Sequence, residues 1–288
     1  MDLSHKKVVF LLTYCEANDW VKFNPPEVFN NKYKDYSFIV LDNGKQTAMK
    51  EWCNNTQSFY YESEYNIGSS GGYNWIFRVA SLLNLDRAIL LQADVEVLSI
   101  EVLDSLLIDN LENNYIPFWP QQPREQWDKY DVGQVYNLGQ IFSFCPNYIL
   151  EHRLLNDENY VVTHFDDADL ARRMRDSGAK LYNKLLDYPD IDCVQIGDKP
   201  EHIAEGLYKI HHISSWNSDN HIIWEEYNQP YHNLKWFRDP DYAWERPFSD
   251  DGDLNRMLPF SHRWTELGYP PYPVEYEVNR FYKQWTSQ

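Results

Sequence analysis

Three groups of acidic and histidine side chains in this 288-residue sequence have residue types and spacings that suit metal binding and proton transfer. They are Asp94 with Glu96, Asp166 with Asp167 and Asp169, and His211 with His212. Hard divalent cations prefer oxygen ligands, and imidazole is a good ligand for Mn²⁺ and a poorer one for Mg²⁺. A carboxylate within hydrogen-bond reach of a hydroxyl can act as a general base. The sequence therefore offers candidates for a metal site and for a catalytic base.

Each group also has a structural interpretation. The segment Asp167–Ser177 has a helical pattern that stops at Gly178, and aspartates at a helix start cap it and suit its dipole. Three aspartates within four residues exceed the needs of a cap. Either histidine can be a satisfied structural residue. Because adjacent residues of a strand point to opposite faces, only one of the two can bind a given metal ion.

Apolar runs that alternate with helical segments predict the framework for these groups. Val8–Leu12, Phe38–Leu41 and Ala88–Gln92 have the length and composition of buried strands, and helical stretches start at about Thr47 and cover Gly71–Leu83. This order predicts βαβ units, and so an α/β fold with a mostly parallel sheet covered on both faces. Ligands of such sheets bind at the carboxyl ends of the strands.

Polar, turn-prone residues follow each of the three apolar runs, as a binding rim requires. They are Thr13-Tyr14, Asp42-Asn43-Gly44 and Gln92-Ala93-Asp94. Asp42 has the chemistry to accept hydrogen bonds from the base or ribose of a nucleotide, with Thr13 and Tyr14 on its other side. Taken alone, Asp42-Asn43-Gly44 favours the interpretation as an ordinary turn.

Three glycines, Gly68, Gly71 and Gly72, precede or open the second helical stretch. Glycine lets a backbone approach a ligand closely, and a helix N-terminus favours an anion such as a diphosphate. A tight loop before a core helix explains the same glycines. The two interpretations have equal weight.

Composition and charge exclude several classes of protein. With 43% hydrophobic and 24% charged residues the chain is typical of folded globular proteins. The net charge of −18 argues against non-specific binding to nucleic acid or anionic membranes. No stretch approaches the roughly 20 apolar residues of a membrane span. Four scattered cysteines without metal-ligand spacing favour reduced thiols and a cytoplasmic location.

The second half of the sequence is rich in aromatic residues. The segment Tyr115–Tyr136 is a predicted long loop whose rings include Trp119, Trp127 and Tyr130. Sugar rings and nucleic-acid bases both stack on such rings, so the loop suits either acceptor; it is also suited simply to cover the core. After about Ile223 proline and aromatic residues become dense, which predicts an irregular extension; the pattern leaves open that helices are hidden in it.

Taken in order, these segments resemble the signature blocks of family 2 glycosyltransferases. The segments are Thr13-Tyr14, Val40–Gly44, Asn66–Asn74 with Ala80, Leu91–Glu96, and His164–Leu170 with Arg173 and Gly178. Leu91–Glu96 is similar to the metal-binding "DxD" block, except that Gln92 stands in place of the usual first Asp. His211-His212, followed by Ile213–Trp216, resembles the late "H…S" segment.

The resemblance implies the GT-A fold, in which a Rossmann-like nucleotide-binding sheet is merged with an acceptor-binding half. Residues 1–222 would form the transferase domain, with a nucleotide-sugar half at 1–98 and an acceptor and catalytic half at 99–222. Residues 223–288 would form the aromatic, proline-rich extension packed on the core.

The resemblance also implies roles for individual residues. The second acidic residue of the acidic block is the general base, here Asp167, with Asp166 as the other candidate; Asp169 would brace the site or pair with Arg173. Mn²⁺ or Mg²⁺ would bind Asp94 and one histidine. Of the two histidines, His211 and His212, motif register favours His211. Residues expected to bind the nucleotide-sugar are Thr13, Tyr14, Asp42, Asn66, Gly68, Gly72, Asn74, Gln92, Ala93 and Asp94.

The activity expected from the resemblance is an inverting, metal-dependent transfer of a sugar from a UDP- or dTDP-sugar to a saccharide. A hydroxymethylated pyrimidine of viral DNA is the alternative acceptor, bound as a flipped base between aromatic rings. A third possibility is a non-catalytic module that binds a nucleotide-sugar or a glycan, because Gln92 removes one charge from the expected metal site. No feature of the sequence indicates an oligomeric state.

Overall fold

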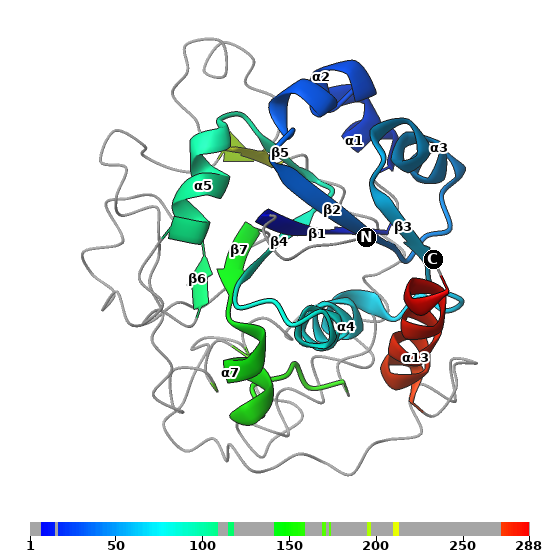
Figure 1. The fold of residues 1–288 in the computed structure, drawn as a ribbon, viewed down its shortest axis with the longest axis vertical. Coiled ribbons are helices and arrows are strands. Elements are labelled where there is room, and N and C mark those ends of the chain that lie inside the picture. The colour runs from blue at the N-terminus through cyan, green and yellow to red at the C-terminus, as the bar shows by residue number, and fades with distance from the viewer. Residues whose placement is uncertain are drawn as a thin grey trace, which may run out of the picture.

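The computed structural model describes residues 7–14, 17–108, 115–117, 141–158, 169–170, 173, 195–196, 210–212 and 272–287 (Figure 1). Its strands are β1 (Lys7–Thr13), β2 (Tyr36–Asp42), β3 (Phe59–Glu62), β4 (Ala88–Gln92), β5 (Val95–Val97), β6 (Tyr115–Pro117), β7 (Ile141–Phe144), β8 (Gln195–Ile196) and β9 (Ile210–His212). Its helices are α1 (Ala17–Phe23), α2 (Pro26–Lys32), α3 (Thr47–Thr56), α4 (Gly68–Leu82), α5 (Ile100–Ile108), α7 (Pro146–Glu151) and α13 (Pro273–Thr286).

Two sheets organise these elements. The larger sheet has the strand order β3-β2-β1-β4-β7-β6; its first four strands are parallel, and β7 is antiparallel to both β4 and β6. The smaller sheet has the order β5-β9-β8, with β9 antiparallel to β5 and parallel to β8. The predicted α/β class with a mostly parallel sheet is confirmed.

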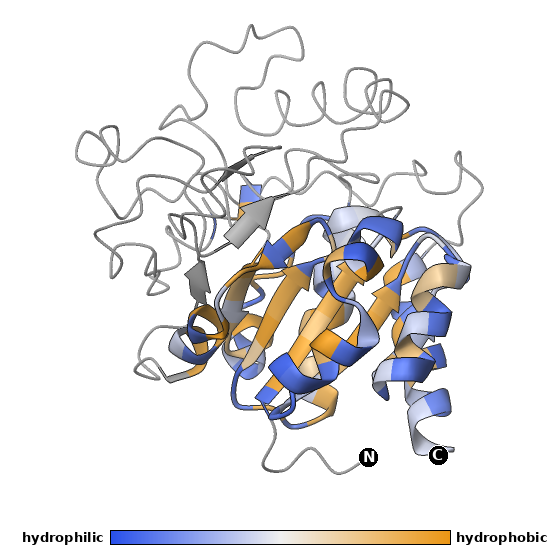
Figure 2. Ribbon diagram, turned by 90° about the horizontal axis from the view of Figure 1, so that it is seen from above, coloured by the Kyte–Doolittle hydropathy of each residue, from blue (hydrophilic) through white to orange (hydrophobic). Residues whose placement is uncertain are grey.

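Strand β1 shows why both faces of the large sheet are covered. Alternate residues of a strand point to opposite faces. Val8, Phe10 and Leu12 join a core cluster with α4, α7 and α13, whereas Val9 and Leu11 join a second cluster with α1, α2, α3 and α5. Figure 2 shows the central strands as hydrophobic along most of their length, as expected of strands buried on both faces.

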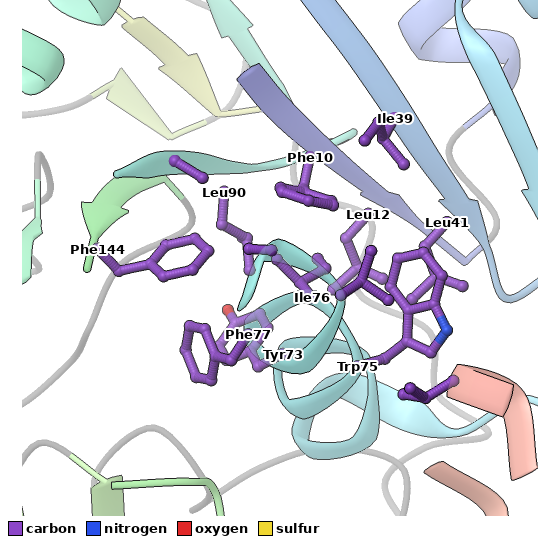
Figure 3. Packing of buried hydrophobic residues seen from close by; sticks show 14 of the residues in the cluster. Phe10, Leu12, Ile39, Leu41, Tyr73, Trp75, Ile76, Phe77, Leu90 and Phe144 are labelled. Carbon is purple, nitrogen blue, oxygen red and sulfur yellow. The ribbon is translucent and has the colours of Figure 1, made fainter. Parts of the chain in front are cut away.

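Helix α4 fills the centre of the first cluster, where Trp75, Ile76 and Phe77 are fully buried (Figure 3). Trp75 lies edge-on to Phe10 of β1, with ring centroids 6.5 Å apart. Burying each such side chain contributes roughly 1.5–3 kcal/mol to folding. This packing fixes α4 beneath β1, and so fixes where its N-terminus lies relative to the strand ends.

Two elements differ from the sequence-based expectation. Helix α4 begins at Gly68, three residues before the predicted start at Gly71, so all three glycines belong to the helix. The C-terminal extension, expected to be irregular, contains the 14-residue helix α13, whose Val274, Val278 and Phe281 are buried in the first core cluster. Within the described ranges, no helix has the length and apolar character that crossing a membrane requires.

Candidate functional site

The parallel strands of the large sheet end together at one edge. Thr13 of β1 pairs in register with Asp42 of β2, and Asp42 pairs with Glu62 of β3. On the other side of β1, Leu12 pairs with Gln92 of β4. Three residues expected in the site, Thr13, Asp42 and Gln92, therefore lie within one residue of the same register row at this carboxyl edge.

The strand order places a topological switch point between β1 and β4. Strands β2 and β3 follow β1 to one side, whereas β4 lies on its other side. The crevice at such a point is where open α/β sheets bind ligands. Thr13 and Tyr14 lie on one side of it, and Gln92, Ala93 and Asp94 on the other.

The carboxylate of Asp42 is fully buried and organises the turn that follows β2. Its Oδ1 accepts a hydrogen bond from the backbone N–H of Gly44 at 2.8 Å, and its Oδ2 accepts one from Gln46 N at 2.7 Å. The hydroxyl of Tyr60 also donates to Oδ2, at 2.9 Å, and burial followed by the nearby Asp42 charge raises the pKa of Tyr60. A nucleotide hydroxyl would have to replace one of these protein donors to bind Asp42.

Gln46, which the sequence analysis did not single out, joins the first two loops of the edge. Its Nε2 donates to Thr13 Oγ1 at 2.9 Å, and its Oε1 accepts from the backbone N–H of Ala17 at 2.8 Å. An amide supplies a donor and an acceptor at once, which this double bridge needs. The available signal was an amide side chain directly after the Asp42–Gly44 turn.

Gly44 allows the loop after β2 to lie against the loop after β1. A Cβ at Gly44 would lie 1.6 Å from the carbonyl oxygen of Tyr14, so any side chain there would displace one of the loops. The adjacent Asn43 donates its backbone N–H to Thr13 O at 2.9 Å. The glycine of this turn is therefore required by a protein contact.

The loop between β3 and α4 lies beside the same turn. Asn43 Nδ2 donates to Gly68 O at 3.3 Å, and Ser63 Oγ donates to Asn43 Oδ1 at 3.0 Å. The half-buried Asn66 accepts the backbone N–H of Gly68 at 3.0 Å, and Gly68 has a φ of 67°, which favours glycine. These bonds place the N-terminus of α4 at the carboxyl edge.

Gly71 and Gly72 make room for protein side chains. A Cβ at Gly72 would lie 2.9 Å from Leu12 Cδ1, and one at Gly71 would lie 2.8 Å from Ile67 Cβ and 3.1 Å from Val274 Cγ2. Close packing against protein side chains therefore accounts for both glycines, which lie within the helix and not in the tight loop that the sequence suggested.

The side chain of Asn74 is hydrogen-bonded to residues 156–158, which lie far from it in the sequence. Its Nδ2 donates at 2.9 Å to both Asn156 O and Glu158 Oε1, and its Oδ1 accepts from Asn156 N at 2.7 Å. Burial raises the pKa of Glu158, and the Arg78 guanidinium at 3.5 Å opposes that effect. In this arrangement Asn74 braces α4 against residues 156–158.

Gln92, the last residue of β4, is hydrogen-bonded to α4. Gln92 Nε2 donates to the hydroxyl of Tyr73 at 2.6 Å, so the residue that stands in place of an acidic one has a partner in the core. Ala93 donates its backbone N–H to Leu12 O at 2.9 Å. Asp94 follows at the turn into β5 with a relative exposure of 9%.

Strand β9 carries both candidate histidines next to this turn. In its pairing with β5, His212 lies opposite Val95 and His211 lies opposite Glu96. Residues more than a hundred positions apart in the sequence are thereby neighbours in one sheet. Among the side chains that the structure describes, no group of three or more histidine, cysteine or acidic residues forms a metal site.

The structure describes three residues of the acidic block, Asp169, Leu170 and Arg173. Asp169, fully buried, accepts a hydrogen bond from Arg173 Nε at 2.8 Å, and Arg173 also donates to Leu155 O. Asp169 therefore pairs with Arg173, one of the two roles expected for it. The candidate bases Asp166 and Asp167 lie outside the described residues, as do Trp119, Trp127, Tyr130 and Tyr136 of the aromatic segment.

No protein-family model matches the chain. A stretch of 82 residues is 30% identical to the low-salt glycan biosynthesis hexosyltransferase Agl10 of Haloferax volcanii; this stretch is 27% of either chain. The chain thus spans about a quarter of the length of the curated relative that it matches.

Two solved structures are similar at low sequence identity. The mannosyltransferase PcManGT of Pyrobaculum calidifontis, in complex with GDP-Man and Mn²⁺, is 14% identical with a TM-score of 0.48, over 72% of this chain and 62% of that chain. Drosophila β1,4-galactosyltransferase 7, in complex with manganese, UDP-Gal and xylobiose, is 13% identical with a TM-score of 0.43, over 73% of this chain and 71% of that chain.

Proposed function

We propose that the protein is a metal-dependent glycosyltransferase that moves a sugar from a nucleotide diphosphate donor to a saccharide acceptor. The observation that carries the proposal is the switch point between β1 and β4, which has Thr13 and Tyr14 on one side and Asp94 on the other. The family resemblance of these segments supports it, and so does the 82-residue similarity to a glycan biosynthesis hexosyltransferase.

In this proposal the nucleotide lies across the carboxyl edge. Thr13, Tyr14 and Asn66 contact the nucleotide. The role of Asp42 is to hold the β2–α3 turn, against which the nucleotide packs. The first backbone N–H groups of α4, which opens at Gly68 beside that turn, favour the anionic diphosphate. Gly72, Asn74, Gln92 and Ala93 support the site from the core, as their protein contacts indicate.

The residues near Asp94 fit a divalent cation. One carboxylate with one imidazole suits Mn²⁺, and Mg²⁺ or Mn²⁺ takes its remaining ligands from phosphate and water. We assign the carboxylate to Asp94 and the imidazole to His211, whose strand position lies opposite Glu96, two residues from Asp94; His212 is the alternative. A bound cation would offset the charge that develops on the leaving diphosphate.

Asp167 is the proposed general base, with Asp166 as the alternative. In an inverting transfer the acceptor hydroxyl gives its proton to this carboxylate while its oxygen bonds to the anomeric carbon. The bond from that carbon to the diphosphate breaks on the opposite face. Two residues after Asp167 in the sequence, Asp169 forms a buried ion pair with Arg173.

The proposed acceptor is a saccharide and the proposed donor is a UDP- or dTDP-sugar. The similarity to a glycan biosynthesis hexosyltransferase supports a saccharide. The net charge of −18 argues against a nucleic-acid acceptor, so we propose a saccharide in preference to modified DNA.

Donor hydrolysis tests the proposal without knowledge of the acceptor. The purified protein is incubated with a panel of nucleotide-sugars and Mn²⁺, and the products are analysed by mass spectrometry. We expect slow release of free sugar and nucleoside diphosphate from a UDP- or dTDP-sugar. Binding of a nucleotide-sugar without hydrolysis or transfer to any saccharide would instead indicate a non-catalytic module. Absence of both binding and hydrolysis would overturn the proposal.

A further inference from the structure

A buried carboxylate on the C-terminal helix is bonded to the loop that precedes α4. Glu277 of α13 has 0% relative exposure. Its Oε1 accepts the backbone N–H groups of Glu64 at 2.7 Å and Tyr65 at 3.1 Å. Its Oε2 accepts the hydroxyl of Tyr61 at 2.6 Å and Arg280 Nη1 at 2.7 Å. All four donors come from the protein, so the carboxylate is fully satisfied.

The two oxygens of this carboxylate serve different elements. Oε2 is held within the core by the β3 residue Tyr61 and by Arg280, the cation that offsets the burial of the charge. Oε1 is thereby aimed at two consecutive backbone N–H groups of the loop. Burial and the hydrogen bond to Glu277 raise the pKa of Tyr61, so its hydroxyl remains a donor.

The same loop is bonded on its other side to the turn after β2. Ser63 Oγ donates to Asp42 O at 3.1 Å and to Asn43 Oδ1 at 3.0 Å. Residues 63–65 are therefore held between the β2–α3 turn and α13. Asn66, the next residue, accepts the N–H of Gly68 at the start of α4.

Helix α13 also packs against the first turn of α4, beside which it lies in Figure 1. Val274 Cγ2 is the neighbour that a Cβ at Gly71 would meet at 3.1 Å. Farther along, Phe281 packs edge-on against Trp75 with ring centroids 5.1 Å apart. The helix therefore braces both the loop and the helix N-terminus that the loop leads into.

We propose that Glu277 is a positioning residue of the donor site, which holds the β3–α4 loop so that Asn66 and the N-terminus of α4 meet the nucleotide diphosphate. This inference rests on the proposed function. Its physical basis is that a loop of free N–H groups samples many conformations, whereas two bonds to a fixed carboxylate select one. Glu277 touches neither donor nor acceptor and acts through the loop.

The test compares three variants with the wild-type protein. Glu277→Ala removes all four hydrogen bonds. Glu277→Gln keeps an acceptor for the loop N–H groups but presents an NH₂ group towards Tyr61 and Arg280. Val278→Ala, on the next residue of α13, loses core packing without touching the loop and so controls for lowered stability. Amide hydrogen exchange of residues 63–67 is measured beside kcat and KM for donor hydrolysis.

We expect Glu277→Ala to speed exchange at Glu64 and Tyr65 at least about tenfold and to raise the donor KM about tenfold, with a smaller change in kcat. Glu277→Gln should retain most of the loop protection and most of the donor affinity. Val278→Ala should lower the melting temperature and leave loop exchange and KM near wild type.

Two results would overturn the positioning role: unchanged loop exchange in Glu277→Ala, or an equal rise in KM in Val278→Ala. A wild-type protein that neither binds nor hydrolyses any nucleotide-sugar overturns the proposed function, and the donor-positioning role with it. Hydrogen exchange is measured without ligand. It therefore still shows whether Glu277 holds the loop, even if the protein binds no nucleotide-sugar.

Discussion

Gln46 Nε2 donates a hydrogen bond to Thr13 Oγ1 at 2.9 Å, and this bond joins the loops that follow β1 and β2. The same side chain accepts the backbone N–H of Ala17 at the start of α1. Two loops that approach the switch point from neighbouring strands are thus held in a fixed relation. The shape of the proposed nucleotide site depends on this amide as well as on the residues that would contact the ligand.

Replacing Gln46 tests that dependence. Gln46→Ala removes three side-chain hydrogen bonds at a half-buried position: those with Thr13 Oγ1, with the backbone N–H of Ala17 and, at 3.4 Å, with Asp42 Oδ1. We expect the free energy of unfolding to fall by about 1–2 kcal/mol. Affinity for the nucleotide-sugar should fall as well. Chemical denaturation and calorimetric titration measure the two effects. Lys50→Ala, at an exposed position of helix α3, which begins directly after Gln46, is the matched control and should change neither. A Gln46→Ala variant that binds the donor normally would separate this bridge from the site.

The metal site is tested at Asp94. Activity should require Mn²⁺ or Mg²⁺ and should be lost in Asp94→Ala, because that variant lacks the proposed carboxylate ligand. His211→Ala should weaken the response to Mn²⁺ more than His212→Ala does. The measurement is donor hydrolysis as a function of metal concentration. Full turnover in excess EDTA would leave Asp94 as a structural residue of the β4–β5 turn.

The proposed base is tested with a nearly isosteric change. Asp167→Asn keeps hydrogen-bonding capacity but cannot take a proton, so the transfer rate should fall by about 10²–10⁴ while donor binding stays close to normal. Single-turnover transfer and donor titration give the two quantities. A near-normal rate would point to Asp166, and a variant that fails to fold would show that the acidic block is chiefly a helix cap.

Glu158 predicts a pH dependence of stability. Burial raises its pKa above the usual 4.5, so the folded protein keeps this proton to higher pH than the unfolded chain does. Its contribution to stability is therefore present below pH 4.5 and is lost as the pH rises through the folded-state pKa. Glu158→Gln removes this titration and can still accept from Asn74. The variant should gain stability relative to wild type as the pH rises above 4.5, measured by denaturation. A relative loss would mean that the ion pair with Arg78 dominates.

The acceptor class is tested by salt. Hydroxyl hydrogen bonds and aromatic stacking carry the recognition of a neutral glycan, so the acceptor KM should barely respond to ionic strength. Binding to DNA would instead weaken with a slope near roughly −0.9 per phosphate contact. Transfer of labelled sugar is compared on oligosaccharides and on hydroxymethylated DNA. Label in the DNA alone would contradict the proposed acceptor.

The sequence by itself predicted the parts of the protein that depend on local pattern. Apolar runs such as Val8–Leu12 have few ways to be buried other than as central strands, and residues after parallel strands must meet at one edge. Thr13, Asp42 and Gln92 were therefore placed on a common rim before any contact was known, and the register of β1 with β2 and β4 confirms that placement.

Only the tertiary structure decided which of those residues form hydrogen bonds within the protein. The chemistry of Asp42 suits a ribose hydroxyl or a turn equally, and its bonds to Gly44, Gln46 and Tyr60 exist because the chain folds back on itself there. The placement of His211 beside the β4–β5 turn is a pairing of strands far apart in sequence, which no local periodicity encodes.

Helix α13 shows how such information is hidden. Val274, Val278, Phe281 and Trp285 recur at helical spacing, but the buried Glu277 interrupts the apolar stripe with a charge. A carboxylate at an inward position is stable only with its donors in place, and those donors lie on β3 and on the loop that follows it, more than two hundred residues earlier. Periodicity describes the apolar pattern of a single helix or strand. The stability of a buried polar side chain depends on hydrogen-bond partners that only tertiary packing brings to it.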